Sequence, residues 1–273
     1  MSLLNILLLF PAIHSLPLSE DVLLITGGYN GSNFLSTNEV LPTPCTVPMF
    51  PGSLLSAPHY SHTTALTADG LILTCGGITN SRKCLVLDVP SQTWVDHSHL
   101  EQSRISSTAV TMPEGLFLFG DDLYDETTSS FLQTGTTEWE AGPPPTGDGI
   151  TGACAIVISE SQFLLIGGWY VPNQVAEYNM MTAQWALWPD LAHGRPEVSC
   201  AKLGDNVIIS GGDEDPSTSI LNLSSKEERT RGDMTTTRGF YFHMAILEGK
   251  LLAIGGDDGH EYLDSIEEWE EVL

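Results

Sequence analysis

The sequence predicts an all-β fold, a kind of β-propeller with six blades that are each a four-stranded antiparallel sheet. Two observations lead to this prediction. A short apolar run that ends in a glycine pair recurs along the chain, and no stretch shows sustained helical periodicity with good helix formers. The chain of 273 residues also contains 26 glycines and 16 prolines, as expected for short strands joined by turns.

The first fifteen residues resemble a leader. They hold an apolar run from Ile6 to Phe10 and end on the small residue Ser15, although the usual basic residue before the run is absent. We therefore expect residues 1–15 to be a signal peptide and residues 16–273 to form one propeller domain of a secreted protein. The alternative is a buried strand over residues 5–12 in a cytoplasmic protein. The run is too short to cross a bilayer, so we expect no transmembrane segment.

The recurring apolar run ends in a glycine pair in five of its six copies. The pairs are Gly27 and Gly28, Gly76 and Gly77, Gly167 and Gly168, Gly211 and Gly212, and Gly255 and Gly256. The third copy in chain order has Gly120 followed by Asp121, and successive copies lie 44 to 49 residues apart. A regular period of this length indicates a repeat architecture.

Further strands accompany each copy. A segment of alternating small and larger residues precedes the apolar run, as in residues 61–66, and a polar loop and a third strand follow the glycines, as in residues 84–88. A tryptophan then stands at Trp94, Trp139 or Trp185. Four short strands bounded by turn residues are the sequence form of a propeller blade. Because one blade cannot bury both of its faces, successive blades are expected to stack around an axis.

The apolar run, the glycine pair, the third strand and the tryptophan together resemble the kelch repeat, from about residue 20 to residue 270. The resemblance implies a kelch-type propeller in which the glycines and Trp94, Trp139 and Trp185 are structural. Copy five departs from the pattern, because residues 226–229 stand where its tryptophan should be. Copy three lacks its second glycine. We expect these two blades to be the least regular.

The propeller scheme pairs four of the five cysteines. Cys75 and Cys84 flank one loop of blade two, and Cys154 and Cys200 lie on the first strands of successive blades. We predict disulfides Cys75–Cys84 and Cys154–Cys200, with Cys45 free. The alternative is that the cysteines are small core residues. Two glycosylation sequons start at Asn30 and Asn222, and both would be acceptors in a secreted protein.

The charge balance limits the partners. The sequence has 35 acidic and 10 basic residues and a formal net charge of −25. A phosphate backbone would meet net repulsion and few basic side chains, so nucleic acid is not an expected partner. Anionic membrane surfaces are disfavoured for the same reason. The oligomeric state cannot be predicted.

The loops after the glycines and those leading into the first strands carry the candidate binding residues. In the kelch family these loops open on one face of the disc. The predicted partner-binding residues are Tyr29, Asn80, Arg82, Arg104, Trp169, Tyr170, Arg195, Asp213, Arg238 and Asp257. Aromatic side chains, a few arginines and carboxylates suit recognition of a protein partner with a basic surface. The alternative is that these loops are ordinary solvated turns.

No catalytic motif, cofactor site or metal site is predicted. The glycine pairs lack the phosphate-loop pattern, and no nucleophile elbow occurs. The first hypothesis is therefore a non-enzymatic, protein-binding propeller. The second is a sugar-binding or sugar-modifying enzyme similar to the sialic acid epimerases of the kelch type, with Arg104, Arg195, Arg238 and His243 as its candidate residues.

The length leaves one question about the ring. Counted from residue 16, the first blade lacks its inner strand and the last lacks its outer strand. The first and last blades are therefore expected to be incomplete, unless residues 5–12 remain as the inner strand of blade one.

Overall fold

The computed structural model describes residues 5–9, 22–41, 60–120, 128–146, 150–212 and 215–269. These residues form β-strands and no helix. The first eleven strands are β1 (Asn5–Leu9), β2 (Val22–Tyr29), β3 (Phe34–Leu41), β4 (His62–Leu66), β5 (Ile72–Gly76), β6 (Lys83–Asp88), β7 (Thr93–His99), β8 (Thr108–Met112), β9 (Gly115–Phe119), β10 (Ser129–Gln133) and β11 (Trp139–Ala141). The others are β12 (Cys154–Ser159), β13 (Gln162–Ile166), β14 (Val175–Asn179), β15 (Gln184–Leu187), β16 (Ser199–Leu203), β17 (Asn206–Ser210), β18 (Ser217–Asn222), β19 (Glu228–Asp233), β20 (Phe242–Leu247), β21 (Lys250–Gly255) and β22 (Ile266–Trp269).

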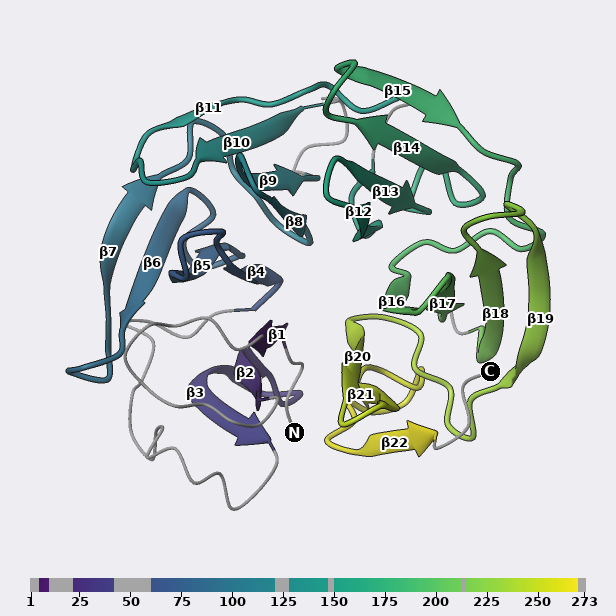
Figure 1. The fold of residues 1–273 in the computed structure, drawn as a ribbon. Coiled ribbons are helices and arrows are strands. Elements are labelled where there is room, and N and C mark those ends of the chain that lie inside the picture. Colours follow the sequence, from purple (N-terminus) through teal and green to yellow (C-terminus); the bar gives the residue numbers. More distant parts are fainter. Residues whose placement is uncertain are drawn as a thin grey trace.

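The described strands make antiparallel sheets arranged in a ring (Figure 1). The sheets are β1–β3, β4–β7, β8–β11, β12–β15, β16–β19 and β20–β22, each with its strands in sequence order. The first strand of each sheet lies nearest the centre of the ring and the last lies at its rim (Figure 1). The predicted all-β propeller is confirmed. The sheets at the two ends of the chain have three described strands, whereas the other sheets have four.

The ring closes between the first and last sheets. β1 pairs with β2 from Asn5 opposite Thr26 to Leu9 opposite Val22, and it also contacts β4 and β20. An apolar cluster joins β2 to the last sheet and contains Leu23, Ile25, Ala245, Leu247, Leu252 and Ile254. Residues 5–9 thus form the inner strand of the first sheet, although they fall within the predicted signal peptide. Cleavage after Ser15 would remove this strand.

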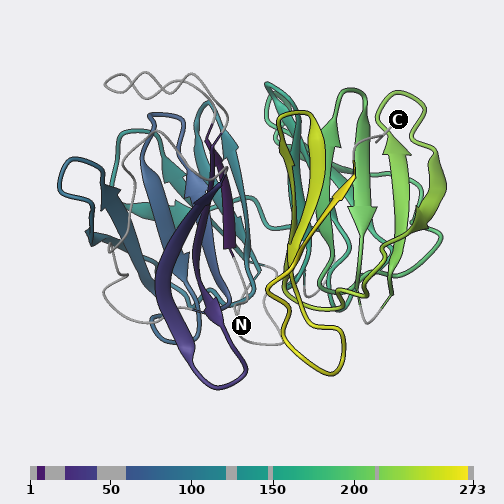
Figure 2. The same cartoon turned by 90° about the horizontal axis from the view of Figure 1, so that it is seen from below.

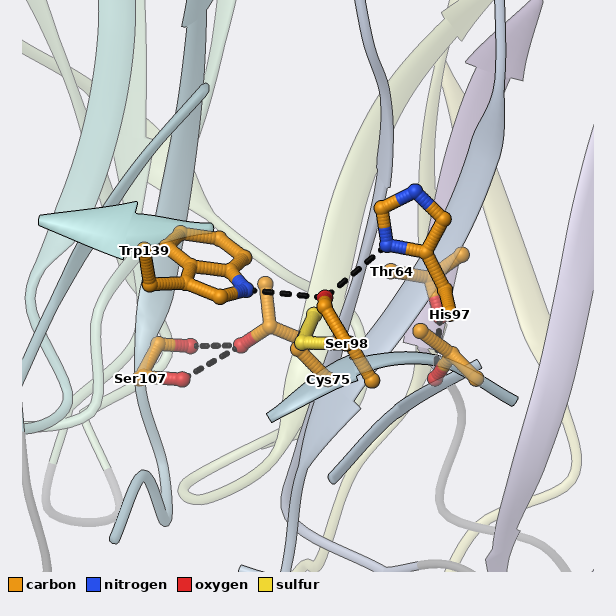
Figure 3. Close-up of a disulfide and its surroundings, with 9 residues drawn as sticks. Thr64, Cys75, His97, Ser98, Ser107 and Trp139 are labelled. Carbon is orange, nitrogen blue, oxygen red and sulfur yellow. Dashed lines mark hydrogen bonds between the residues drawn. A yellow bond between two sulfur atoms is a disulfide. The ribbon is translucent and has the colours of Figure 1, made fainter. Parts of the chain in front are cut away.

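The remaining core also lies between neighbouring sheets. One cluster combines Leu73 and Cys75 with Leu116 and Leu118, from the second and third sheets. Trp139 belongs to it and is buried, and its Nε1 donates to Ser98 Oγ of the preceding sheet at 2.9 Å (Figure 3). Trp139 thus has the structural role that the resemblance implies for the tryptophans.

Trp94 is also buried, and Trp185 packs edge-on against Phe163 and Phe119. In the fifth sheet, where the tryptophan is missing, Lys226 lies over the ring of Trp188 from the preceding sheet, 4.4 Å from its centroid. This cation–π contact joins the fourth and fifth blades.

The first glycine of the second pair lies against the next blade, and the second glycine lies against the start of its own blade. Gly76 and Gly77 have φ of 74° and 88°. A Cβ on Gly76 would lie 2.2 Å from the carbonyl oxygen of Arg104, and one on Gly77 would lie 2.7 Å from that of Tyr60. Both positions require glycine for conformation and for space.

Both predicted disulfides are confirmed. Cys75 and Cys84 stand opposite each other on β5 and β6 and are bonded (Figure 3). Cys154 and Cys200 join β12 to β16, the inner strands of neighbouring blades. The predicted free cysteine, Cys45, lies outside the described residues. Within those residues no helix is long and apolar enough to cross a membrane.

The close approach at Gly76 makes a prediction about stability. Gly76→Ala is expected to lower the free energy of unfolding by about 2 kcal/mol more than Gly135→Ala, because overpacking costs about 1–3 kcal/mol. Gly135 has a similar φ of 80°, but a Cβ added there would meet no heavy atom within 4 Å, so it is the matched control. Urea unfolding of the two variants measures the difference, and equal losses would contradict the argument from close approach.

The place of β1 makes a second prediction. A chain that begins at residue 16 is expected to melt at a lower temperature than a chain that begins at residue 5, because it leaves β2 without its inner neighbour. Thermal unfolding followed by circular dichroism measures the difference. Coincident melting curves would show that the first sheet does not depend on β1.

Candidate functional site

One face of the ring gathers the loops that follow the glycine pairs. The loops between β2 and β3 and between β21 and β22 project together from this face, at the bottom of Figure 2. The segments leading into the inner strands lie at the same face, because Gly77 N donates to the carbonyl oxygen of Arg104 and Gly168 N to that of Arg195. We call this side of the ring the loop face.

A ring of left-handed residues stands at the start of the inner strands. Ser61, Ser106, Gly152, Glu197 and Tyr241 have φ between 48° and 72°. They recur every 44 to 46 residues, one before the inner strand of each sheet from the second to the last. Four of them are not glycine, and non-glycine residues in this region store about 1–3 kcal/mol of strain each and cluster at functional sites.

Backbone hydrogen bonds connect members of this ring. Ser106 N donates to Ser61 O, Gly152 N to Ser106 O, and Val198 N to Gly152 O, each at 3.0 Å. These left-handed residues thus turn their carbonyl oxygens toward the next blade. The strain is therefore offset by bonds that hold the blades together at the centre.

The five left-handed residues line a central cavity of about 220 Å³ at the loop face. The first halves of β4, β8, β12, β16 and β20 supply its walls, which are rich in hydroxyl groups. Several of these hydroxyls bond between blades. Thr63 Oγ1 lies 2.7 Å from Ser107 Oγ, Thr108 Oγ1 accepts from Ala155 N at 3.0 Å, and the Cys154–Cys200 disulfide also lies in the wall.

Glu197 is the one carboxylate among the described residues that line the cavity, and none of them is lysine or arginine. Its Oε1 accepts a hydrogen bond from Trp169 Nε1 at 3.0 Å. Gly152 leaves room for it, since a Cβ there would lie 3.0 Å from Glu197 Cδ. Burial raises the pKa of Glu197 to about 7, and the bond from Trp169 opposes that shift.

A chain of aromatic rings lies next to the cavity, and two of them, Tyr60 and Tyr241, line it. Tyr60 contacts Tyr29 and Tyr241 with centroids 5.6 and 5.2 Å apart, and Phe240 stacks on Trp169 at 5.7 Å. Burial raises the pKa of both Tyr60 and Tyr241, which keeps their hydroxyls neutral. We define the aromatic collar as Tyr29, Phe34, Tyr60, Trp169, Phe240, Tyr241 and Tyr262.

The collar is partly open to solvent. Trp169 is 44% and Phe34 is 39% exposed, and the neighbouring Tyr170 is 50% exposed. Ile78, in the loop after the second glycine pair, is 48% exposed. Apolar side chains from three blades therefore present themselves to solvent around one cavity, an arrangement typical of binding surfaces.

Arg195 does not point into the mouth as predicted. Its side chain is 1% exposed, and its Nη1 donates to the carbonyl oxygens of Gly211 and Ser217 at 2.9 and 3.0 Å. Its Nη2 donates to Ser217 Oγ at 2.8 Å. These bonds tie the segment before β16 to β17 and β18 of the same blade.

Arg104 and Arg238 are equally buried and make equivalent bonds. Their acceptors are Gly120, Thr128 and Ser130 for Arg104, and Gly255 and Ser265 for Arg238. Burial lowers the pKa of Arg195 and of Arg238, while nearby carboxylates oppose the shift. The prediction that the three arginines bind a partner or an acidic sugar is therefore corrected. Their buried guanidinium groups bond carbonyl oxygens of their own blades, and we call these three residues blade clips.

The other predicted residues are dispersed. Arg82 is exposed and its Nε donates to Leu100 O at 3.0 Å, while Asn80 is half-buried in the loop before β6. Asp257 bridges to Tyr262 and its Oδ1 accepts from Gly259 N at 2.7 Å. Asp213 lies outside the described residues.

The histidines and carboxylates make no metal site in the described part of the chain, where no group of three or more His, Cys, Asp or Glu side chains converges. His243 lines the cavity, and burial lowers its pKa to about 4, so it is neutral. His62 also lines the cavity, and its Nε2 lies 3.0 Å from Thr26 Oγ1.

Sequence reasoning found Tyr29, Trp169 and Tyr170 but missed Tyr60, Tyr241 and Glu197. The signal for the missed residues was the repeat period itself. Residues 61, 106, 152, 197 and 241 stand 14 or 15 residues before the first glycine of their copies, and all five line the cavity. Tyr60 immediately precedes the first of them.

The raised pKa of Glu197 predicts how stability depends on pH. Between the ordinary value of 4.5 and about 7, the folded protein keeps a proton that the unfolded chain releases, so the free energy of unfolding falls as pH rises through this range. Glu197→Gln is neutral throughout and lacks this fall. We expect the difference in stability between variant and wild type to change by about 2–3 kcal/mol from pH 5 to pH 8, measured by urea unfolding. Parallel pH profiles of the two proteins would contradict this.

The comparisons with known proteins identify the fold. No protein-family model matches the sequence, and no curated protein is significantly similar to it. Among solved structures, that of YjhT matches with a TM-score of 0.72 over 97% of this chain and 94% of YjhT, at 14% sequence identity. Similarity of this extent at so low an identity shows that the chain shares the β-propeller fold.

Proposed function

We propose that this chain is a kelch-type propeller that binds a polypeptide partner at the loop face, without catalysis. The observation that supports the proposal most directly is the partly exposed aromatic collar around the central cavity. Tryptophan and tyrosine are enriched among the residues that dominate binding energy at protein interfaces. The collar is drawn from several blades, so the ring holds its members in fixed relative positions.

The size of the cavity favours a polypeptide over an enclosed substrate. Pockets that enclose small-molecule ligands usually measure about 300–1,000 Å³, whereas this cavity is about 220 Å³. A side chain inserted from a bound polypeptide needs less space than a whole ligand. The collar would then contact the backbone and the flanking side chains of the same partner.

A sugar-binding or sugar-modifying enzyme is the second candidate. The hydroxyl-rich walls and the protonatable Glu197 favour it. The three arginines that the sequence offered for an acidic sugar are blade clips, so a neutral sugar is the better candidate of this class.

We also propose that the protein is secreted. Two disulfides support this, because such bonds persist mainly in oxidising compartments. Asn30 lies in the loop after β2 and Asn222 ends β18: Asn30 Oδ1 accepts from Ser32 N, and Asn222 Oδ1 accepts from Ser224 N.

Selection of linear peptides from a displayed library tests the proposed function. Peptides enriched on the wild type are expected to bind Trp169→Ala/Tyr170→Ala at least tenfold more weakly, since truncating such aromatic residues commonly costs more than about 1 kcal/mol each. Met181→Ala/Leu187→Ala is the matched control, because both side chains are exposed apolar groups away from the collar, at 83% and 63%. Isothermal titration calorimetry measures the affinities.

Two results would contradict the proposal. One is the absence of any enriched peptide, and the other is equal loss in both double variants. Binding of neutral glycans on an array, weakened by Glu197→Gln, would support the sugar hypothesis instead.

A further inference from the structure

Glu197 has no basic partner among the described residues. It is the one carboxylate among the described residues of the cavity wall, and none of the ion pairs in the described part of the chain includes it. Its one charge-compensating contact there is the hydrogen bond from Trp169 Nε1. Glu197 is half-buried, and a carboxylate withdrawn from water is normally paired with a cation or surrounded by several donors.

The surroundings of Glu197 suit a cation. The cavity walls carry hydroxyl groups and backbone carbonyls, and no lysine or arginine from the described residues occupies them. Tyr60 and Tyr241 line the cavity, and Trp169, stacked on Phe240, is bonded to the cavity-lining Glu197. Aromatic faces attract ammonium and guanidinium groups, and more strongly where water is excluded.

The backbone holds Glu197 in place for such a role. Its φ of 55° is an unusual conformation for glutamate, and the adjacent Val198 N is bonded to Gly152 O at 3.0 Å. Gly152 is the member of the left-handed ring without a side chain, and its space is where the Glu197 carboxyl lies. The strained backbone and the missing side chain together direct one carboxylate into the cavity.

We propose that the cavity accepts the cationic end of one basic side chain of the bound polypeptide, a lysine ammonium or an arginine guanidinium, with the Glu197 carboxylate as its counter-ion. This inference rests on the proposed function and adds the chemistry of the partner's central residue. The net charge of −25 supports it, because the protein's field attracts a basic segment over long range.

The proposal includes a dependence on pH. A cation binds the ionised form of Glu197, whose pKa is raised to about 7. Below pH 7 the carboxyl must first release its proton, so the affinity for the cation falls as the pH is lowered. The groups that face the cavity beside it are Tyr60, Tyr241, His62 and His243. The tyrosines have raised pKa values and His243 a lowered one of about 4, so these three stay neutral from pH 5.5 to pH 8.

Small probes test the inference on the full chain. The probes are N-acetyl-arginine amide and N-acetyl-lysine amide, with N-acetyl-citrulline amide as the neutral isostere of arginine. The indole N–H signal of Trp169, assigned by its loss in Trp169→Phe, reports binding by NMR. We expect both cationic amides to shift this signal at pH 8, with at least tenfold weaker binding at pH 5.5 and in Glu197→Gln, and citrulline amide to bind at least tenfold more weakly.

Glu177→Gln is the matched control. Glu177 also accepts a hydrogen bond from an indole, Trp188 Nε1 at 2.7 Å, but it lies on β14 outside the cavity wall. This variant should bind the cationic amides as the wild type does. Affinity measured against pH in Glu197→Gln gives any pH dependence of binding that does not come from Glu197. Affinity measured against pH in the wild type tests the proposal even if the variant does not fold.

The inference is overturned if citrulline amide binds as well as arginine amide, if affinity is unchanged between pH 5.5 and pH 8, or if no cationic amide binds the wild type. These failures differ from failure of the proposed function. If the selected peptides bind through Trp169 but carry no basic residue, the proposed polypeptide site is supported and the cation inference is overturned. If the cationic amides bind but no peptide is selected, the cation site is supported and the proposed polypeptide partner is contradicted.

Discussion

Neighbouring blades of this propeller meet where a glycine pair lies against the main chain that leads into the next blade. At Gly76 the backbone of the next blade approaches so closely that no Cβ fits, and Gly77 N donates to the carbonyl oxygen of Arg104. The side chain of Arg104 then reaches into its own blade. One residue thus joins two sheets, through its backbone to the sheet before and through its guanidinium group to its own sheet. The remaining geometry of the loop face depends on this contact.

The left-handed ring stands next to the same contact. In three blades the chain has three residues between the arginine clip and the inner strand, while Ser61 and Gly152 begin blades without such an arginine. In each of these five blades a left-handed residue makes the turn. Because its carbonyl oxygen accepts from the next blade at Ser61, Ser106 and Gly152, the turn cannot relax without opening the centre. The fold therefore provides a set of fixed positions around the cavity whose side chains are free to differ. Serine, glycine, glutamate and tyrosine occupy them here.

Most of the architecture could be predicted from the sequence, because the glycine pairs and their period are local features with a steric cause. The disulfides were predictable for the same reason, once strands were placed on blades. The arginines misled the prediction. Their positions at the starts of inner strands were right, but sequence alone cannot tell that a long side chain turns back into its own blade to bond carbonyl groups. Glu197 was missed because its importance comes from the absence of other charges among the described residues around the cavity, which depends on the three-dimensional arrangement of several blades.

The contact between β1 and β20 has a consequence for how the chain reaches this structure. The strands that close the ring lie at residues 5–9 and 242–247, so nearly the whole chain separates them. Each blade is built from neighbouring segments and can form early, but the final seam requires two remote parts to meet, and such non-local pairing is slow. Until then, Leu23 and Ile25 lack the last sheet that covers them. We therefore expect the seam to be the last part to assemble and the part most exposed to aggregation while the protein folds.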